Sequence, residues 1–288
     1  MSARLLICTD LDRTLIPNGP QPESAGAQAH FATLAARPGV TLTYVSGRHR
    51  ELVQAAIDEY RLPPPDYAVC DVGTTIYHLR EGRSWQRQAA WEADIARDWN
   101  GLGRGDLELA LTGLDELRLQ EASRQNSCKL SYYLPPEFDR ERLAPPIESR
   151  LDALGVSARL VWSVDDATGT GLLDVLPARA SKYHAILALM RDRQFGATET
   201  VFCGDSGNDI EVLASSIPGV LVANSSPEVQ SLAERLARAE GHANRLYIAR
   251  GGFKGMNGYY VGGMLEGIAH YYPHTVEWMG FDAAECGA

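Results

Sequence analysis

The chain has 288 residues, of which 45% are hydrophobic, and carries a formal net charge of −10 at pH 7. This apolar content is enough for a substantial core, which excludes wholesale disorder, and the length predicts one large or two modest domains. The negative charge disfavours nucleic acids and anionic membranes as partners, because both need a basic surface. We find no apolar run of membrane-spanning length and expect no signal peptide. Five cysteines without close spacing indicate a reducing compartment, so we expect a cytoplasmic protein.

Strand and helix patterns alternate at both ends of the chain. Near the start of the chain, apolar runs predict strands at 4–9, 41–45 and 67–70, and helices are expected between them at 23–36 and 51–60. The alternation returns later, with strands expected at 172–176, 200–203 and 219–223 and helices at 182–193, 209–215 and 261–271. Such alternation is typical of an α/β fold with a parallel sheet between helices.

Residues 80–171 have a different character. They combine several tryptophans and a glycine-rich stretch at 101–105 with strands expected at 128–134 and 159–163 and helices at 91–99 and 147–154. We interpret this segment as an inserted α+β domain. The catalytic core would then consist of residues 1–79 and 172–288.

Four aspartates follow two of the predicted core strands. Asp10 and Asp12 come directly after the first strand, and Asp205 and Asp209 follow the strand at 200–203. The carboxyl ends of parallel strands can meet at one edge of a sheet, so these carboxylates are expected to lie close together. They would repel one another unless a cation held them, and hard oxygen ligands favour Mg²⁺.

The spacing of Asp10 and Asp12 also indicates a reaction. In an extended segment, side chains two residues apart point the same way. One carboxylate can attack phosphorus to form an aspartyl-phosphate, while its neighbour moves protons. The alternative interpretation is an acidic loop that is merely solvated.

Further motifs favour an anion site. Ser46, Gly47 and Arg48 end the second strand, where a hydroxyl and backbone N–H groups at a helix start can bind an anion. Lys182 is expected in the first turn of a helix, a poor place for a cation unless an anion offsets the dipole, and Asn208 can hydrogen-bond a phosphate oxygen. The alternatives are a helix cap, a solvated lysine and a simple turn.

Taken in chain order, these motifs resemble the haloacid dehalogenase-like phosphohydrolase superfamily. Within it, several stretches are similar to the sucrose-phosphate phosphatase group, of the Cof-type subfamily: 65–77, 126–133, 173–177, 204–209 and 263–270. The resemblance implies a Rossmann-like core with a parallel sheet and an inserted α+β cap that selects the substrate.

The resemblance also implies roles for single residues. Asp10 would be the nucleophile and Asp12 the general acid/base, with phosphate bound by Ser46, Gly47, Arg48, Lys182 and Asn208. Mg²⁺ would be bound by the side chains of Asp10 and Asp205 and the main-chain carbonyl of Asp12, with Asp209 in support. The chain departs from the family pattern at Arg13, where small or amide residues are usual, and at Tyr183, where glycine is frequent.

We therefore expect a cytoplasmic, Mg²⁺-dependent phosphatase whose partner is a small-molecule sugar phosphate, a disaccharide phosphate such as sucrose 6-phosphate. In the cap, Gln120 and Lys129 are candidates for contacts to sugar or phosphate. Six aromatic side chains would either stack on a sugar or, as we favour, fill the cap core: Trp85, Trp91, Trp99, Tyr132, Tyr133 and Trp162.

Other functions stay open at this point. The substrate could instead be mannosylfructose phosphate or mannosyl-3-phosphoglycerate, and a phosphosugar mutase would use the same chemistry. A non-catalytic sugar-phosphate-binding regulatory module would have reason to lose the nucleophile, which is present here. A response-regulator receiver domain is disfavoured because such domains are shorter and have no inserted cap.

Overall fold

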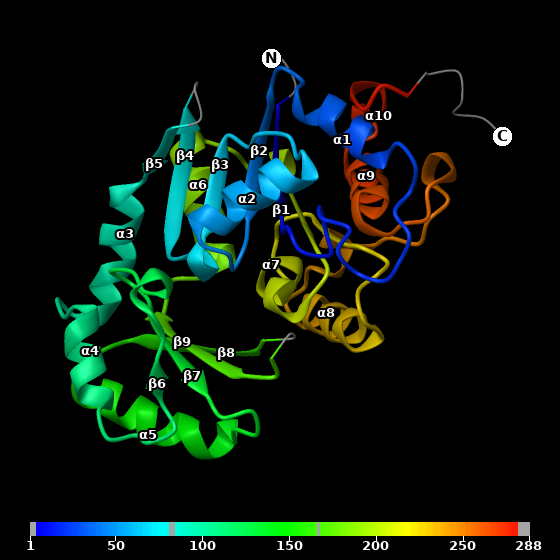
Figure 1. Cartoon of the computed structure of the whole chain (residues 1–288). Helices are drawn as coiled ribbons and strands as arrows, with labels where there is room; N and C mark the ends of the chain where they lie inside the picture. Colours follow the sequence, from blue (N-terminus) through cyan, green and yellow to red (C-terminus); the bar gives the residue numbers. More distant parts are fainter. Residues whose placement is uncertain (1–3, 81–83, 166–167, 282–288) are drawn as a thin grey trace.

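The computed structural model describes residues 4–80, 84–165 and 168–281 and contains two β-sheets (Figure 1). The larger sheet has the strand order β12-β11-β10-β1-β2-β3-β4-β5. Its strands are β1 (Leu5–Thr9), β2 (Val40–Val45), β3 (Tyr67–Cys70), β4 (Thr75–Arg80), β5 (Ser84–Arg87), β10 (Thr200–Gly204), β11 (Gly219–Leu221) and β12 (Leu246–Ile248). The six strands from β12 to β3 are parallel, and β4 and β5 continue the sheet in antiparallel pairs.

The register of the central strands aligns their carboxyl ends. Thr9 at the end of β1 pairs with Tyr44 of β2 on one side and with Cys203 of β10 on the other. The loops that follow these three strands therefore begin side by side. All five residues of β1 are buried, as expected for a parallel strand covered on both faces.

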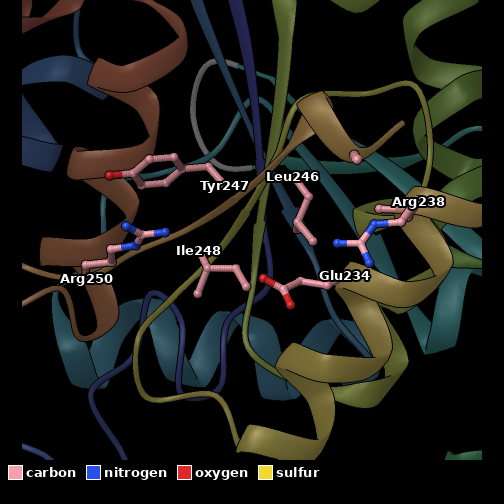
Figure 2. A pocket seen from close by; sticks show the side chains of 8 residues that line it. Glu234, Arg238, Leu246, Tyr247, Ile248 and Arg250 are labelled. Atoms are coloured by element: carbon pink, nitrogen blue, oxygen red, sulfur yellow. The ribbon is translucent and has the colours of Figure 1, made fainter. Parts of the chain in front are cut away.

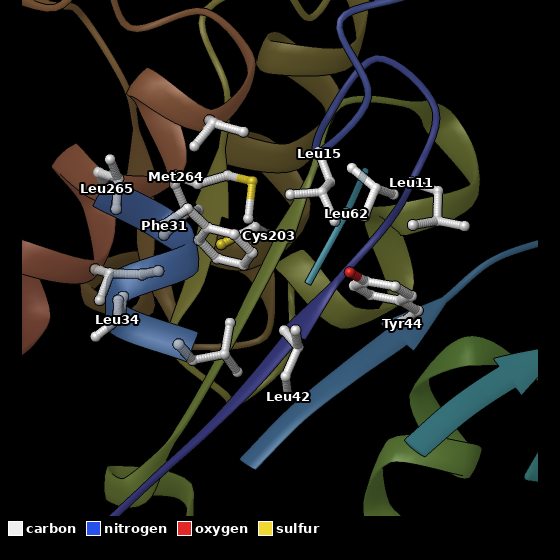
Figure 3. Close-up of a cluster of buried hydrophobic side chains, with 14 of the residues drawn as sticks. Leu11, Leu15, Phe31, Leu34, Leu42, Tyr44, Leu62, Cys203, Met264 and Leu265 are labelled. Carbon is white, nitrogen blue, oxygen red and sulfur yellow. The ribbon is translucent and has the colours of Figure 1, made fainter. Parts of the chain in front are cut away.

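Alternate residues of β1 enter two different apolar clusters. Leu5 and Ile7 point to the face covered by α1 (Ala27–Ala35), α2 (Arg50–Tyr60) and α9 (Tyr260–Tyr271). Figure 3 shows part of this cluster, with Phe31 of α1 near Met264 of α9. Leu6 and Cys8 point to the opposite face, covered by α6 (Lys182–Arg193), α7 (Ile210–Leu213) and α8 (Pro227–Ala239). The period-two alternation of a strand thus supplies both layers of the core. A final short helix, α10 (Thr275–Trp278), packs beside α1 and α9.

The smaller sheet is wholly antiparallel, in the order β6-β7-β9-β8. Its strands are β6 (Arg118–Leu119), β7 (Leu130–Leu134), β8 (Ala158–Val164) and β9 (Gly171–Pro177). One face packs against α4 (Arg104–Leu111) and α5 (Arg140–Ala153) through a third apolar cluster that includes Trp99, Leu107, Ile147 and Leu173. The helix α3 (Ala89–Ala96) leads from the larger sheet to this unit (Figure 1).

The strand pairings differ from the predicted boundaries at both junctions. β5 pairs with β4 in the larger sheet, although the insertion was predicted to begin at residue 80. β9 pairs with β7 and β8 in the smaller sheet, although its residues were assigned to the core. The apolar alternation of β9 fits either sheet, and only its pairing partners decide between them. The division into a core and a cap domain stays an interpretation.

The helix α5 begins earlier than expected. The sequence predicted a helix only from 147, after Pro145 and Pro146, yet α5 starts at Arg140 and includes both prolines. Each proline lacks an N–H group and weakens the helix. The buried Leu143, Ile147 and Leu151 pack against the smaller sheet, and this contact holds the helix together across the prolines.

Candidate active site

Three carboxylates gather where β1 and β10 end. Asp10 follows β1, Asp205 and Asp209 follow β10, and oxygens of all three lie within 4.8 Å of one another. All three side chains are buried. Two backbone N–H groups, of Asp205 and Ser206, donate to Asp209 Oδ2 at 3.1 Å and fix its orientation.

A glycine makes this turn possible. A Cβ on Gly204 would lie 2.6 Å from the carboxylate carbon of Asp209, a distance that side chains do not tolerate. Glycine has no side chain, so it leaves room for the Asp209 carboxylate directly against the end of β10. This close contact explains why the motif has a glycine at position 204.

Lys182 lies among these carboxylates. It is the first residue of α6, which Ser181 caps by accepting a hydrogen bond from the backbone N–H of His184. The Nζ atom of Lys182 lies 2.7 Å from Asp209 Oδ1, 3.1 Å from Asp10 Oδ1 and 2.8 Å from Asn208 Oδ1. Burial lowers the pKa of Lys182, but the two carboxylates raise it by more, so the amine stays protonated.

The position of Lys182 depends on a glycine that the sequence analysis did not single out. Gly73 follows β3 with φ +95°, and a Cβ there would lie 2.4 Å from the carbonyl carbon of Ser181. The segment after β3 therefore packs directly on the start of α6. The only signal for this contact was the presence of Gly73 in the family-like stretch 65–77.

Burial and mutual repulsion shift the acidic groups. Burial raises the pKa of Asp10 to about 7, with Asp209 and Asp205 adding to the effect and Lys182 opposing it. Burial and the charge of Asp209 likewise raise the pKa of Asp205 to about 7. A buried set of carboxylate oxygens with an unfavourable excess of negative charge fits a hard divalent cation such as Mg²⁺.

Asp12 lies outside the carboxylate cluster. Its oxygens accept two hydrogen bonds from Arg48, Nη2 to Oδ1 at 2.6 Å and Nε to Oδ2 at 2.8 Å. Asn18 Nδ2 donates to Asp12 Oδ1 at 2.7 Å. Arg48, predicted to bind phosphate, therefore contacts the predicted acid/base in this structure.

A cavity of about 260 Å³ connects most of the predicted residues. It lies between the loops after β1, β2 and β10 and is lined by Asp10, Asp12, Arg13, Ser46, Gly47, Arg48, Asp205, Ser206 and Asn208. Beside it, a larger cleft of about 780 Å³ lies between β8 and the loop before α7. Lys182, Ser206 and Asn208 also line this cleft, so the two spaces adjoin.

Lys129 and Gln120 have different surroundings. Lys129 is buried, and its Nζ lies 3.6 Å from Asp174 Oδ1 on the neighbouring strand β9. Lys129 also lowers the pKa of Asp71, which burial raises, so the lysine lies near the segment after β3. Gln120 instead donates from Nε2 to the carbonyl of Tyr132 at 2.9 Å, a bond that extends the β6–β7 edge.

Sequence reasoning missed three polar residues near Lys129: Asp71, Asn126 and Asp174. Asn126 Nδ2 donates to Thr74 Oγ1 at 2.9 Å and also hydrogen-bonds Asp71, bridging the two sheets. Asp174 accepts a hydrogen bond from Ser131. Asn126, Asp174 and Lys129 lie in family-like stretches, but no pattern indicated that they meet. We call Asp71, Asn126, Lys129 and Asp174 the junction cluster.

Most of the six aromatic side chains pack in apolar clusters, but only some of them in the core of the smaller sheet, as favoured. Trp99 and Tyr132 belong to the cluster of the smaller sheet, and Trp162 packs against it. Trp91 belongs to one cluster of the larger sheet and Trp85 packs against the other, so these two do not fill the cap core. Tyr133 differs, because its hydroxyl donates to Glu121 at 2.8 Å and Arg118 stacks on its ring.

A separate hollow, of about 180 Å³, lies between α8 and the edge strand β12 (Figure 2). Its charged residues are Glu234, Arg238 and Arg250. None of the predicted site residues lines it, so the acidic cluster is the better candidate for chemistry.

Comparison with known proteins identifies the family. A family model described as sucrose-6F-phosphate phosphohydrolase matches residues 3–272. The chain belongs to this family. As a member of the sucrose-6F-phosphate phosphohydrolase family it is a phosphatase, a phosphoric monoester hydrolase, and the predicted superfamily is confirmed.

The relatives agree with this assignment. A putative HAD-like hydrolase of Nitrosococcus oceani is 50% identical over 97% of this chain and 75% of its own length. Sucrose-phosphatase 1 of Nicotiana tabacum is 30% identical over 79% of this chain, which spans only 52% of that relative. Mannosylfructose-phosphate phosphatase of Agrobacterium fabrum is 30% identical over 80% of this chain and 87% of its own length.

Solved structures confirm the α/β fold. The sucrose-phosphatase of Synechocystis sp., solved in complex with sucrose and phosphate, has a TM-score of 0.70 at 27% identity and covers 93% of this chain and 98% of its own. A haloacid dehalogenase-like hydrolase from Bacillus subtilis, yhjK, has a TM-score of 0.63 at 18% identity, covering 97% and 93%. Among the described residues, no helix has the length and apolar character needed to cross a membrane.

Proposed function

We propose that this chain is a Mg²⁺-dependent phosphatase that hydrolyses a disaccharide phosphate, such as sucrose 6-phosphate, through an aspartyl-phosphate on Asp10. The observation that carries the proposal is the buried group of Asp10, Lys182 and Asp209, in which one ammonium contacts both carboxylates. Such a site neutralises charge next to a carboxylate nucleophile at the floor of a polar cavity.

In the first step, a carboxylate oxygen of Asp10 attacks phosphorus and the bond from phosphorus to the sugar oxygen breaks. Asp12 gives a proton to the departing sugar oxygen. In the second step, water attacks the aspartyl-phosphate, Asp12 accepts a proton from that water, and inorganic phosphate leaves with Asp10 restored. Lys182 stabilises the negative charge on the transferring group throughout.

The donor set supports the proposed metal requirement. Asp10 and Asp205 would hold Mg²⁺ with support from Asp209, whose orientation the backbone N–H groups fix. When bound, Mg²⁺ supplies positive charge that offsets the phosphoryl oxygens and the crowded carboxylates.

The contact between Arg48 and Asp12 supports a role for Arg48 in substrate entry. A phosphate group is a better partner for a guanidinium than a half-exposed carboxylate, because it carries more negative charge. In the proposal, Arg48 exchanges Asp12 for phosphate oxygens. This exchange would release Asp12 to act as acid and base.

The junction cluster supports the sugar part of the proposal. Its members offer donors and acceptors at the boundary between the two sheets, and sugar hydroxyls need such partners. The cleft of about 780 Å³ that adjoins the small cavity lies within the range of roughly 300–1,000 Å³ for small-molecule sites. The solved Synechocystis relative contains sucrose and phosphate, which favours a disaccharide.

One alternative substrate has a specific observation behind it. The mannosylfructose-phosphate phosphatase of Agrobacterium fabrum is as similar to this chain as the tobacco sucrose-phosphatase is, with 30% identity to each. Mannosylfructose phosphate therefore remains a second candidate.

A phosphate-release screen tests the proposal. Sucrose 6-phosphate and mannosylfructose phosphate are compared with glucose 6-phosphate, fructose 6-phosphate and p-nitrophenyl phosphate, each with Mg²⁺ and with EDTA. We expect release from one disaccharide phosphate with the highest kcat/KM, and only with Mg²⁺. Equal rates on monosaccharide phosphates would refute the disaccharide assignment, and rearranged sugar without free phosphate would indicate a mutase.

Asp10→Asn is the matched control for this screen. We expect it to lower kcat at least about 10⁴-fold, because the amide cannot form the covalent intermediate. The melting temperature and the binding of sucrose 6-phosphate should be retained. Substantial residual turnover would contradict the assignment of Asp10 as nucleophile.

A further inference from the structure

One cation beside the carboxylate cluster has no role in the mechanism above. The Nε atom of Arg13 lies 3.3 Å from Asp205 Oδ2, and its Nη2 donates to the carbonyl of Asn224 at 3.1 Å. Arg13 also lines the small cavity, together with Ser46 and Arg48. A guanidinium thus lies next to a predicted metal ligand and faces the space where a phosphate would bind.

The backbone holds Arg13 in place. Its φ of +57° is left-handed, which is uncommon for a residue with a side chain. The Arg13 N–H donates to Asn18 Oδ1 at 2.8 Å, and Asn224 Nδ2 donates to the Arg13 carbonyl at 2.7 Å. Asn224 is itself buried and accepts a hydrogen bond from the backbone of Tyr260 at 2.9 Å. The base of the Arg13 side chain is therefore fixed.

The end of the side chain is not fixed in the same way. The Arg13 side chain is 46% exposed, whereas that of Asp205 is only 4% exposed. Water can solvate the half-exposed guanidinium when it leaves, and a divalent cation can replace its charge at the buried Asp205, so the exchange costs little. A long side chain on a fixed base can reach either the carboxylate or the adjoining cavity.

A divalent cation and Arg13 compete for the same carboxylate. Each neutralises Asp205, and each repels the other when both are close. Metal binding at Asp205 therefore favours a position of the guanidinium away from this carboxylate, in the cavity lined by Ser46 and Arg48. An anion there would attract it, because charge-assisted contacts from arginine to phosphate are strong.

We propose that Arg13 couples the metal site to the phosphate site: it holds Asp205 before the metal ion binds, is displaced by the ion, and then contacts the phosphate in the cavity. This inference rests on the proposed Mg²⁺ site. It has two consequences of opposite sign. Arg13 weakens Mg²⁺ binding in the absence of phosphate, and it strengthens phosphate binding once Mg²⁺ is present.

Calorimetry on Arg13→Met tests both consequences without turnover. Mg²⁺ is titrated into the phosphate-free protein, and inorganic phosphate is titrated into the protein saturated with Mg²⁺. We expect Mg²⁺ to bind about five- to tenfold more tightly than to the wild type, since a competing cation is gone. We expect phosphate to bind about tenfold more weakly, since one charge-assisted contact is lost.

Arg37→Met is the matched control, because it removes the same charge from an exposed position just before β2, at the opposite end of the strands. It should leave both affinities unchanged. Arg13→Lys, which keeps the charge, should lie between the wild type and Arg13→Met and serves as a second variant if Arg13→Met folds poorly.

Several results would overturn the inference. Weaker binding of both ions to Arg13→Met would show that Arg13 only supports the loop, and unchanged affinities would show that it does not compete at Asp205. These results leave the proposed function intact if the wild type binds Mg²⁺ normally. If the wild type binds no Mg²⁺, the proposed metal site is wrong and the coupling falls with it.

Discussion

Arg48 holds both carboxylate oxygens of Asp12, at 2.6 Å and 2.8 Å. This pair links the loop after β1 to the loop after β2, next to the cavity that both residues line. A proton-transferring carboxylate and an anion-binding guanidinium thus occupy each other before a substrate is present. In the proposed mechanism both are released for their roles at the moment when phosphate enters.

Arg48→Lys should raise KM for the sugar phosphate about tenfold, because a lysine cannot make the two parallel contacts of a guanidinium. The free energy of unfolding should change by less than about 1 kcal/mol, since the side chain of Asp12 is 40% exposed. Steady-state kinetics and urea denaturation measure the two effects. The control is Arg50→Lys, because Arg50 forms an exposed ion pair with Glu51 within α2. A large loss of stability with an unchanged KM would mean that Arg48 is only structural.

Lys182→Met should destabilise the metal-free protein by about 3–5 kcal/mol, because it leaves two buried carboxylates without their cation. Added Mg²⁺ should restore part of this loss by supplying positive charge to the same carboxylates. Urea denaturation with EDTA and with Mg²⁺ measures both quantities. Arg191→Met, at an exposed position of the same helix, should change the free energy of unfolding by less than about 0.5 kcal/mol. Equal losses in the two variants would contradict this account of Lys182.

The metal-free protein should lose stability as pH rises from about 4 to about 7. The pKa values of Asp10 and Asp205 are raised to about 7 in the folded state, above the unfolded value of 3.8. The folded state therefore holds protons that the unfolded state releases, so unfolding becomes easier as these carboxyls ionise. Thermal unfolding in EDTA at several pH values measures the slope. Asp205→Asn should flatten the slope and stabilise the fold at pH 8. A wild-type slope that Asp205→Asn leaves unchanged would show that other groups cause it.

Lys129→Met should raise KM for the disaccharide phosphate about tenfold and KM for p-nitrophenyl phosphate by less than about twofold. The lysine belongs to the junction cluster, where it would contact the sugar. Its replacement by methionine would remove a charge-assisted hydrogen bond to the substrate. Using two substrates on one variant cancels any general effect on folding. Gln120→Leu should affect the two substrates equally, because Gln120 bonds the backbone of the smaller sheet. Equal effects of Lys129→Met on both would mean that Lys129 does not contact the sugar.

Much of the core could be predicted from local pattern. The helix at Lys182–Arg193 begins and ends where the sequence indicated, because Ser181 supplies a cap and the apolar residues recur at helical spacing. The strand at Tyr67–Cys70 was likewise predicted at its observed bounds. Other elements were missed. The helix α8 has a Ser226 cap, Pro227 at its start and a clear amphipathic period, so the sequence did carry its signal. The strand β12 has only three residues, too few to show a period.

The sequence alone determined the chemical groups of the site and the strand ends at which they lie, since strand alternation and loop composition are local properties. Only the tertiary structure decided which groups meet: Lys182 with Asp209, Arg48 with Asp12, and Arg13 with Asp205. It also decided that β9 joins the smaller sheet. These contacts join residues far apart in the chain, and their geometry depends on strand order and packing, which no local pattern contains.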